Sequence, residues 1–151
     1  MTGAPGLGEG RPPSPLRLIW TTFPDSPTAR AASARIVELG LAACATEMPA
    51  YSIYHWEGRL EQNAEVVVLY KTTPKKVGML FEEIRRLHPY GVPEIVEVEA
   101  GRVYEPYLRW VLDVVDSEPE QAARAAGLAT PEKKTPKRPA RPRAPGASGP
   151  P

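Results

Sequence analysis

The sequence has few side chains that cross-link a protein or hold a metal, since it contains one cysteine and two histidines among 151 residues. A single cysteine excludes a disulfide, a CxxC redox pair and an all-cysteine zinc site within one chain. No apolar run is long enough to span a membrane, and residues 1–15 lack the apolar core of a secretory signal. We therefore expect a cytoplasmic protein with no membrane partner.

The motifs of common enzyme classes are also missing. The sequence has no GxSxG, Walker, HExxH or Rossmann glycine pattern, so no standard nucleophile or phosphate-handling site is indicated. The glycines of GLGEG, near the start of the chain, follow no predicted strand and so lack the context of a nucleotide-binding loop. We expect a protein without enzymatic activity and without an organic cofactor.

Proline is abundant, and its distribution divides the chain. Most of the 19 prolines lie near the two ends, within segments that contain very few large apolar side chains. Such segments cannot bury enough surface to offset the entropy cost of ordering them. We predict a disordered arm over 1–15, one folded domain over 16–116, and a disordered tail rich in Pro, Lys and Arg over 117–151.

The charge of the chain is uneven as well. Residues 131–151 contain six lysines or arginines and one glutamate, a net charge of +5, so residues 1–130 have −4 against the total of +1. An acidic folded domain is not expected to bind nucleic acid, which usually requires a basic face. The basic tail either touches an anionic partner weakly or is only a solvated extension.

Hydrophobic periodicity predicts four strands and three helices. Strands are expected at 15–22, at 41–48 continued at 51–56 beyond a break at Pro49, at 60–73 and at 92–100. Helices are expected from a cap at Asp25 or Ser26 to Gly40, from a cap at Thr73 to Pro89, and over 105–115. This β-α-β-β-α-β order with an extra C-terminal helix is an α+β, ferredoxin-like sandwich, in which both main helices cover one face of an antiparallel sheet.

Three features predict a closed oligomer. The strands around the EGR turn form a hairpin that is too long for a small sheet and would expose its edges. The sheet face opposite the helices has no cover. The last helix has one apolar side with Leu108 and Val111 and another with Tyr107 and Trp110. It needs two partners, and we expect one of them to be a second subunit.

Three residues are candidate metal ligands, and the first two also have structural explanations. Cys44, in a strand of small residues, is either a buried core thiol or a soft ligand. His88, before Pro89 at the end of a helix, either interacts with the last carbonyls or binds metal as a neutral imidazole. Glu94 follows closely and could pair with His88 in a site for Cu(II) or Zn.

Six further residues are candidates for a small-molecule cleft: Tyr54, Trp56, Lys71, Tyr90, Tyr107 and Trp110. The aromatic side chains are more simply explained by packing. Lys71 ends an apolar strand just before the second predicted helix, and an ammonium near a helix N-terminus favours a carboxylate or phosphate. It could instead pair with Glu57 or Glu94.

The motifs LGLAACATEMPAYSIYHWEGRLEQNAEVVVLYKTT, HPYGVPEIVEV and YEPYLRW occur in this order. Through them residues 17–116 resemble the CutA family of divalent-cation tolerance proteins. The resemblance implies a tight homotrimer, similar in shape to the PII signalling trimers, with hairpins paired across subunits and the six cleft residues gathered between them. It also implies a link to copper and other divalent ions, with ligands proposed at His88, Glu94 and the strand cysteine. Leu87 and Thr21 stand where some relatives carry a further histidine and cysteine, which weakens metal binding here.

The main prediction is thus a non-enzymatic homotrimer for divalent-metal tolerance, with copper or another metal bound weakly by Cys44, His88 and Glu94. The alternative is a PII-like sensor that binds a small anion between subunits and signals to a protein partner. A third hypothesis is a scaffold that displays three basic tails to a partner.

Overall fold

The computed structural model describes residues 14–116. Its elements are β1 (Arg17–Phe23), α1 (Ser26–Glu38), β2 (Cys44–Trp56), β3 (Arg59–Thr72), α2 (Val77–Leu87), β4 (Ile95–Glu99) and α3 (Glu105–Val115). This element order confirms the one predicted from periodicity. The predicted disordered arm, apart from its last two residues, and the predicted disordered tail lie outside the described residues.

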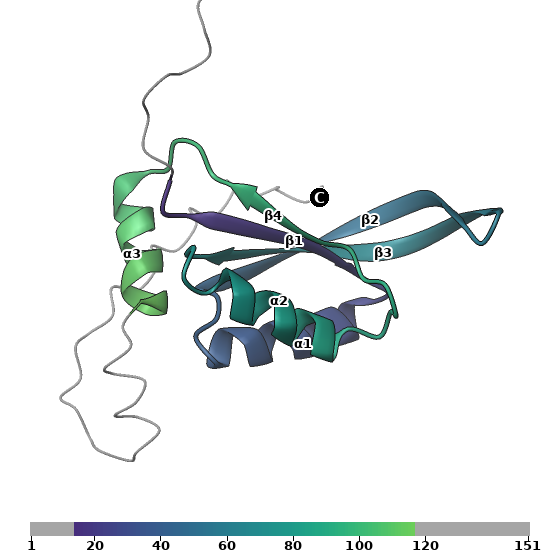
Figure 1. The fold of residues 1–151 in the computed structure, drawn as a ribbon, viewed down its shortest axis with the longest axis horizontal. Coiled ribbons are helices and arrows are strands. Elements are labelled where there is room, and N and C mark those ends of the chain that lie inside the picture. Colours follow the sequence, from purple (N-terminus) through teal and green to yellow (C-terminus); the bar gives the residue numbers. More distant parts are fainter. Residues whose placement is uncertain (1–13, 117–151) are drawn as a thin grey trace, which may run out of the picture.

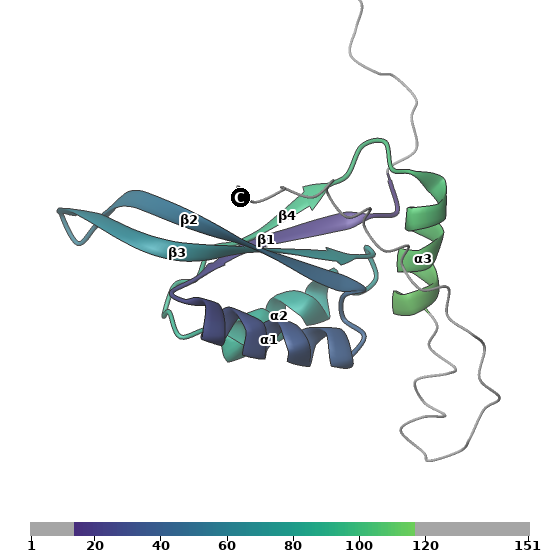
Figure 2. The same ribbon diagram turned by 180° about the vertical axis from the view of Figure 1, so that it is seen from behind.

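The four strands form one antiparallel sheet in the order β2-β3-β1-β4. Both views show α1 and α2 on the same face of this sheet and α3 at one end of it (Figures 1 and 2). The fold is therefore α+β, with the layers that the sequence predicts. Within residues 14–116, no helix is long and apolar enough to cross a membrane.

The main core lies between the sheet and the two helices that cover it. Ile19 and Phe23 of β1 and Tyr70 of β3 point into it, and Ile36 of α1 and Ile84 of α2 meet them there, all without exposed surface. These residues follow the predicted spacings, since alternate strand positions and every third or fourth helix position face one way. Leu39, the C-cap residue of α1, is 37% exposed.

The start of α1 agrees with its capping signals. Asp25 is the N-cap, and its carboxylate accepts a hydrogen bond of 2.8 Å from the backbone N–H of Thr28. Pro27 lies in the first turn, where its missing N–H leaves no helix bond unmade. Beyond the other end of the helix, Gly40 adopts φ 69°, a left-handed conformation that glycine accepts without strain.

The predicted break in the second strand is wrong. β2 runs without interruption from Cys44 to Trp56, and Pro49 pairs with Val66 of β3 within it. The reason is the position of β2 at the edge of the sheet. An edge strand can place the N–H side of a proline toward solvent, so the residue does not end the pairing.

The predicted cap of the second helix is also wrong. α2 begins at Val77 with Lys76 as its N-cap, and residues 74–76 form a turn before it. The hydroxyl of Thr73 donates instead to Asp116 Oδ1, at 2.9 Å, beyond the end of α3. The Thr73 side chain thus makes a tertiary contact with Asp116 instead of capping α2.

The last helix packs against its own domain on both of its apolar sides. Val111 and Val115 are fully buried beside Leu16 and Ala43. The other apolar side chains, including Tyr107, Leu108, Trp110 and Val114, are partly buried against the same cluster. The subunit itself therefore covers part of this second apolar side, and contact of the remaining exposed part with a second subunit stays a prediction.

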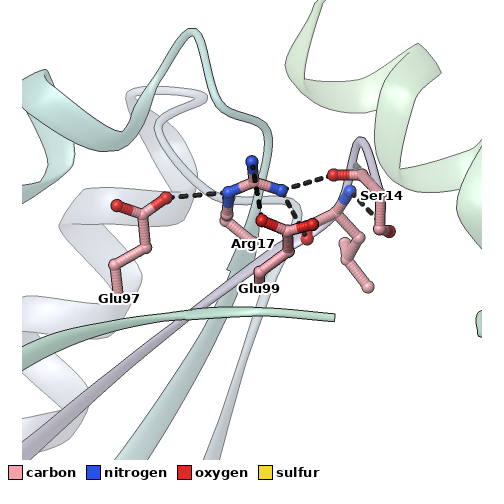
Figure 3. A network of polar contacts seen from close by, with 5 residues as sticks. Ser14, Arg17, Glu97 and Glu99 are labelled. Atoms are coloured by element: carbon pink, nitrogen blue, oxygen red, sulfur yellow. Dashed lines mark hydrogen bonds and ion pairs between the residues drawn. The ribbon is translucent and has the colours of Figure 1, made fainter. Parts of the chain in front are cut away.

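An arginine network joins the two strands next to this helix. Arg17 of β1 forms ion pairs with Glu97 at 2.8 Å and Glu99 at 3.5 Å, both on β4 (Figure 3). The same guanidinium donates to the carbonyl oxygens of Ser14 and, at 3.3 Å, Leu16. It thereby fastens the start of the described chain to the edge strand.

The hairpin and the face of the sheet opposite α1 and α2 remain uncovered in the single chain. β1 pairs with β3 only as far as Val66, so residues 59–65 of β3 pair with β2 alone and project beyond the sheet (Figures 1 and 2). The open face exposes Trp20 by 37%, Met48 by 37%, Val96 by 46% and Val98 by 42%. A large apolar surface of this kind marks a place for another surface to bind.

Candidate functional site

His88 lies at the end of α2 that is nearer to the hairpin. Its ring has a stacking partner, and each of its two nitrogens has a hydrogen-bond partner. The ring stacks on Phe23 with centroids 4.5 Å apart. Nε2 lies 2.6 Å from the carbonyl oxygen of Thr22, and Nδ1 lies 3.1 Å from the backbone nitrogen of Tyr90. Because the Tyr90 N–H must donate, Nδ1 accepts, and the protonated Nε2 donates its hydrogen bond to the carbonyl oxygen of Thr22. The structure thus defines one neutral tautomer.

Burial agrees with a neutral ring. Removal from water lowers the pKa of His88, and this effect outweighs the opposing influence of the Thr22 carbonyl and the Glu65 carboxylate. A neutral imidazole is the form that binds a metal ion, but both nitrogens already have partners. Metal binding through His88 would require one of these two contacts to be exchanged.

The histidine belongs to a chain of polar contacts. Tyr90 donates from its hydroxyl to Glu65 Oε1 at 2.9 Å, while Thr22 donates from its hydroxyl to Glu94 Oε2 at 3.2 Å. Burial and the neighbouring Glu65 carboxylate raise the pKa of Tyr90 to about 12. His88 and Glu94 therefore both contact Thr22. The histidine ring contacts its carbonyl oxygen, and the glutamate carboxylate contacts its hydroxyl.

Cys44 lies at the other end of the sheet from these two residues. It pairs with Lys71, which pairs with Leu18, whereas the His88 contact is at Thr22, four positions further along β1. At about 3.3 Å per strand residue, the two positions are offset by roughly 13 Å along the strands alone. Among residues 14–116, no three Cys, His, Asp or Glu side chains are grouped so as to hold a metal ion. In one chain His88 and Glu94 therefore share Thr22 as a partner, and Cys44 lies away from it.

The surroundings of Cys44 contain half of the predicted cleft residues. Cys44 Sγ lies 3.5 Å from the hydroxyl of Tyr107, whose ring is 5.7 Å from that of Trp110. Lys71 donates from Nζ to the Thr46 hydroxyl and, at 3.2 Å, to the Leu69 carbonyl. The Lys71 ammonium thus lies over the strands rather than at the first turn of α2, which corrects the expected link to a helix N-terminus.

The other three cleft residues lie elsewhere. Tyr54 accepts a hydrogen bond of 2.9 Å from Asn63 across the hairpin, and Trp56 pairs with Arg59 beside the hairpin turn. Tyr90 belongs to the His88 network at the base of the hairpin. Within the described chain the six residues do not form one cleft, so a cleft made of all six needs more than one subunit.

Two members of the His88 network were not identified from the sequence. Thr22 has no distinguishing signal, since a threonine in a strand is ordinary. Glu65 did have one, because it is a single carboxylate within the apolar run AEVVVLY. A buried carboxylate needs a partner, and here that partner is Tyr90. The strand pattern could therefore have indicated the residue but not its partner.

Comparison with known proteins identifies the family. The model of the family "CutA1 divalent ion tolerance protein" matches residues 17–114. The divalent-cation tolerance protein CutA of Thermococcus kodakarensis is 36% identical over 98 residues, which are 65% of this chain and 94% of that protein. Protein CutA of Mus musculus is 35% identical over 114 residues, 75% of this chain, but the match spans only 64% of the length of the mouse relative.

Solved structures agree with these relatives. The crystal structure of CutA from Xylella fastidiosa matches with a TM-score of 0.67 and 36% identity, over 68% of this chain and all of that one, 100%. The matched region includes all the strands and helices described above except the last residue of α3. On this evidence the chain belongs to the CutA1 divalent ion tolerance protein family.

Proposed function

We propose that the protein acts in the tolerance of divalent metal ions as a cytoplasmic, non-enzymatic homotrimer of ferredoxin-like subunits, with the PII-like shape expected from its sequence. The observation that supports this most is the family match over residues 17–114. The uncovered sheet face and the projecting hairpin support the assembly, because each is a surface that a second and third copy of the chain could cover.

In this proposal a divalent metal such as copper binds weakly at His88 and Glu94. The two side chains offer a borderline nitrogen and a hard oxygen donor, which suit Cu(II) or Zn(II). Binding is expected to be weak because His88 must give up its contact with Thr22 or Tyr90, and Glu94 its contact with the Thr22 hydroxyl. Cys44 can complete such a site only from a different subunit.

The test is a calorimetric titration of Cu(II), Cu(I) and Zn(II) into the purified full chain. A His88→Ala, Cys44→Ser double variant should lose saturable binding at one site per subunit. His55→Ala is the matched control, because His55 is the second of the two histidines and is exposed on the hairpin. If wild type and the double variant bind equally, or neither binds, these residues are structural and the metal proposal fails.

A second candidate function is a sensor that binds a small anion between subunits and signals to a protein partner. The specific observation in its favour is the placement of Lys71, Tyr107 and Trp110 at one end of the subunit and of Tyr54 and Trp56 on the hairpin at the other. A trimer in which each hairpin reaches a neighbour would combine the two sets.

Thermal stabilisation by ligands distinguishes the two candidates. The first predicts a rise in Tm with metals and none with nucleotides or carboxylates, and the second predicts the reverse. Under the second, Lys71→Met should remove the rise in Tm caused by the anion. A rise that persists in Lys71→Met would show that this ammonium does not hold the anion.

A further inference from the structure

Tyr90 donates hydrogen bonds to two groups that could otherwise bind a metal ion. Its backbone N–H donates to Nδ1 of His88 at 3.1 Å, and its hydroxyl donates to Oε1 of Glu65 at 2.9 Å. The rings of Tyr90 and His88 lie beside each other, with centroids 5.0 Å apart. One residue thus occupies a ring nitrogen and a carboxylate oxygen at the same time.

The contact with His88 uses the electron pair that a metal ion would need. A neutral imidazole has one N–H and one nitrogen with a free electron pair. In His88 the N–H at Nε2 donates to the carbonyl oxygen of Thr22 at 2.6 Å, so the free pair is at Nδ1, where it accepts from Tyr90. The ring can offer this pair to a metal ion only by withdrawing it from the Tyr90 N–H.

The same conclusion holds for coordination through the other ring nitrogen. If Nε2 provides the electron pair, the proton of the neutral ring must lie on Nδ1. The Nδ1–H group would then face the backbone N–H of Tyr90, and two donors cannot form a hydrogen bond with each other. Whichever nitrogen of His88 is the ligand, its contact with the Tyr90 backbone is lost.

Little else fixes the loop to which Tyr90 belongs. Residues 89–92 lie between α2 and β4, and Tyr90 is the one residue of these four that is not exposed. Val92 is 74% exposed, and a β-carbon at Gly91 would meet no atom within 4 Å. Segments with few buried contacts open at a low cost in free energy. The loop can therefore move once the Tyr90 contacts are broken, while the rest of the domain stays folded.

The second contact of Tyr90 connects this loop to the base of the hairpin. Glu65 is 8% exposed and precedes Val66, the residue of β3 at which pairing with β1 ends. Figure 1 shows the loop between α2 and β4 at the end of the sheet from which the hairpin projects. Hydrogen bonds to a carboxylate are stronger than those between neutral groups. The bond to Glu65 therefore opposes any movement of Tyr90 away from His88.

We propose that Tyr90 competes with metal ions for His88, an inference that rests on the metal binding proposed above. The Tyr90 N–H occupies the free electron pair of the ring, and the bond from its hydroxyl to Glu65 keeps that N–H in place. When His88 binds a metal ion, Tyr90 is released from both partners. The metal-bound and metal-free proteins then differ in the loop 89–92 and at the base of the hairpin.

A zinc titration of the full chain tests this proposal. Zn(II) is titrated calorimetrically into wild type and Tyr90→Phe, which lacks the hydroxyl but keeps the backbone N–H. Tyr90→Phe should bind Zn(II) about ten-fold more tightly, because a hydrogen bond to a carboxylate no longer opposes binding. Tyr51→Phe is the matched control. The Tyr51 hydroxyl also donates to a hairpin residue, Gln62, at 3.4 Å but lies outside the site, so this variant should bind as wild type does.

Hydrogen exchange in the wild-type protein tests the backbone contact without a substitution. The amide of Tyr90, followed by NMR, should exchange at least about ten-fold faster in saturating Zn(II) than without it, because its acceptor is lost. The amide of Leu80, which donates to the carbonyl oxygen of Lys76 at 2.9 Å, is the internal control and should not change.

The possible results distinguish the role of Tyr90 from the metal site itself. If His88→Ala abolishes Zn(II) binding but Tyr90→Phe binds no more tightly than wild type, Tyr90 does not compete, and the metal site stands without it. An amide of Tyr90 that stays equally protected in saturating Zn(II) would overturn the proposal in the same way. If neither wild type nor Tyr90→Phe binds Zn(II) in a saturable manner, the metal site and the role of Tyr90 both fail.

Discussion

The side chain of Tyr70 illustrates how single polar groups are accommodated in the core. It is fully buried on β3, and its hydroxyl lies 3.0 Å from the hydroxyl of Ser33 on α1. Burial raises the pKa of Tyr70 to about 12, so the group stays neutral at physiological pH. Each hydroxyl is the partner that makes burial of the other acceptable.

Removing both of these hydroxyls should therefore cost less than the sum of the costs of removing each one alone. We expect Tyr70→Phe alone and Ser33→Ala alone each to lower the free energy of unfolding by roughly 1–3 kcal/mol, because each leaves one buried group unpaired. The double variant should lose less than the sum of the two. Urea unfolding of the four proteins measures this cycle. Strictly additive losses would show that the hydroxyls do not depend on each other.

The buried His88 ring should make the free energy of unfolding depend on pH. Burial lowers its pKa below the usual 6.5, so the unfolded chain takes up a proton more readily than the folded one. Its contribution to the free energy of unfolding is complete above that pH and is lost as the pH falls through the folded-state pKa. We expect the denaturant midpoint to be lower at pH ~5.5 than at pH ~7.5 when both are measured at one protein concentration. This difference should be smaller in His88→Gln than in wild type.

The control for this prediction is the other histidine. His55 lies exposed on the hairpin, so His55→Gln should keep the whole loss of stability in acid. An equal acid loss in wild type and His88→Gln would assign the effect to other groups.

At the level of single residues, the sequence predicts what local chemistry decides. Asp25, one of the two predicted caps, and Gly40 after the first helix are correct because each depends on the backbone within a few residues. Thr73 is wrong as a cap because its hydroxyl binds Asp116, which lies 43 residues further along the chain. Nothing in the local sequence distinguishes these two kinds of threonine contact.

Among the elements, the hairpin turn depends on a backbone conformation that few residues accept. Glu57 has φ 48° and Gly58 has φ 76°, and the strands pair on either side of them through Trp56 and Arg59. Two consecutive left-handed residues are typical of the tight turn whose twist matches a hairpin. For glycine this conformation is free of strain, but for other residues it costs about 1–2 kcal/mol.

Glycine to alanine substitutions should therefore have opposite effects in two elements. We expect Gly58→Ala to lower the free energy of unfolding by roughly 1 kcal/mol through strain at positive φ. Gly78→Ala should raise it by about 0.5–1 kcal/mol, because alanine is the better helix former and its methyl group meets no atom there. Thermal or urea unfolding of both variants provides the measurement, and equal signs would contradict the structure.

The order of the elements was predictable, but two of their boundaries were not. Periodicity identifies each strand and helix because burial of one side dictates it. Pro49 suggested a break because the sequence does not reveal that β2 is an edge strand, which is a property of the whole sheet. A turn at 74–76 stands where the first helical turn was predicted, and α2 begins at Val77.

For the whole molecule, the candidate sites show where sequence reasoning ends. The spacing of His88 and Glu94 suggested a pair, and in the structure both contact Thr22, one at its carbonyl oxygen and the other at its hydroxyl. Cys44 could not be placed relative to them without the strand register, which puts it at the far end of the sheet. Sites formed by several subunits are harder to predict than sites within one chain, because no simple sequence pattern shows which surfaces of the subunits contact each other.

The proposed trimer rests on the open sheet face and can be tested there. Trp20 and Val96 pair directly across β1 and β4, at the same level of that face. A lysine at Val96 would stay in water in a single subunit, where this residue is 46% exposed, but would be buried without a partner charge in the trimer. An uncompensated buried charge of this kind typically costs about 3–5 kcal/mol at each copy.

We therefore expect Val96→Lys to give folded monomers where the wild type sediments as a trimer, with an unchanged far-ultraviolet circular dichroism spectrum. Val37→Lys is the matched control, because Val37 is a valine of similar exposure, 37%, on the helix side of the domain. It should remain trimeric, since α1 lies on the face that the assembly leaves open. If both variants sediment as wild type does, the apolar sheet face is not the interface, and the cleft that combines Lys71 with the hairpin aromatics cannot be built across it.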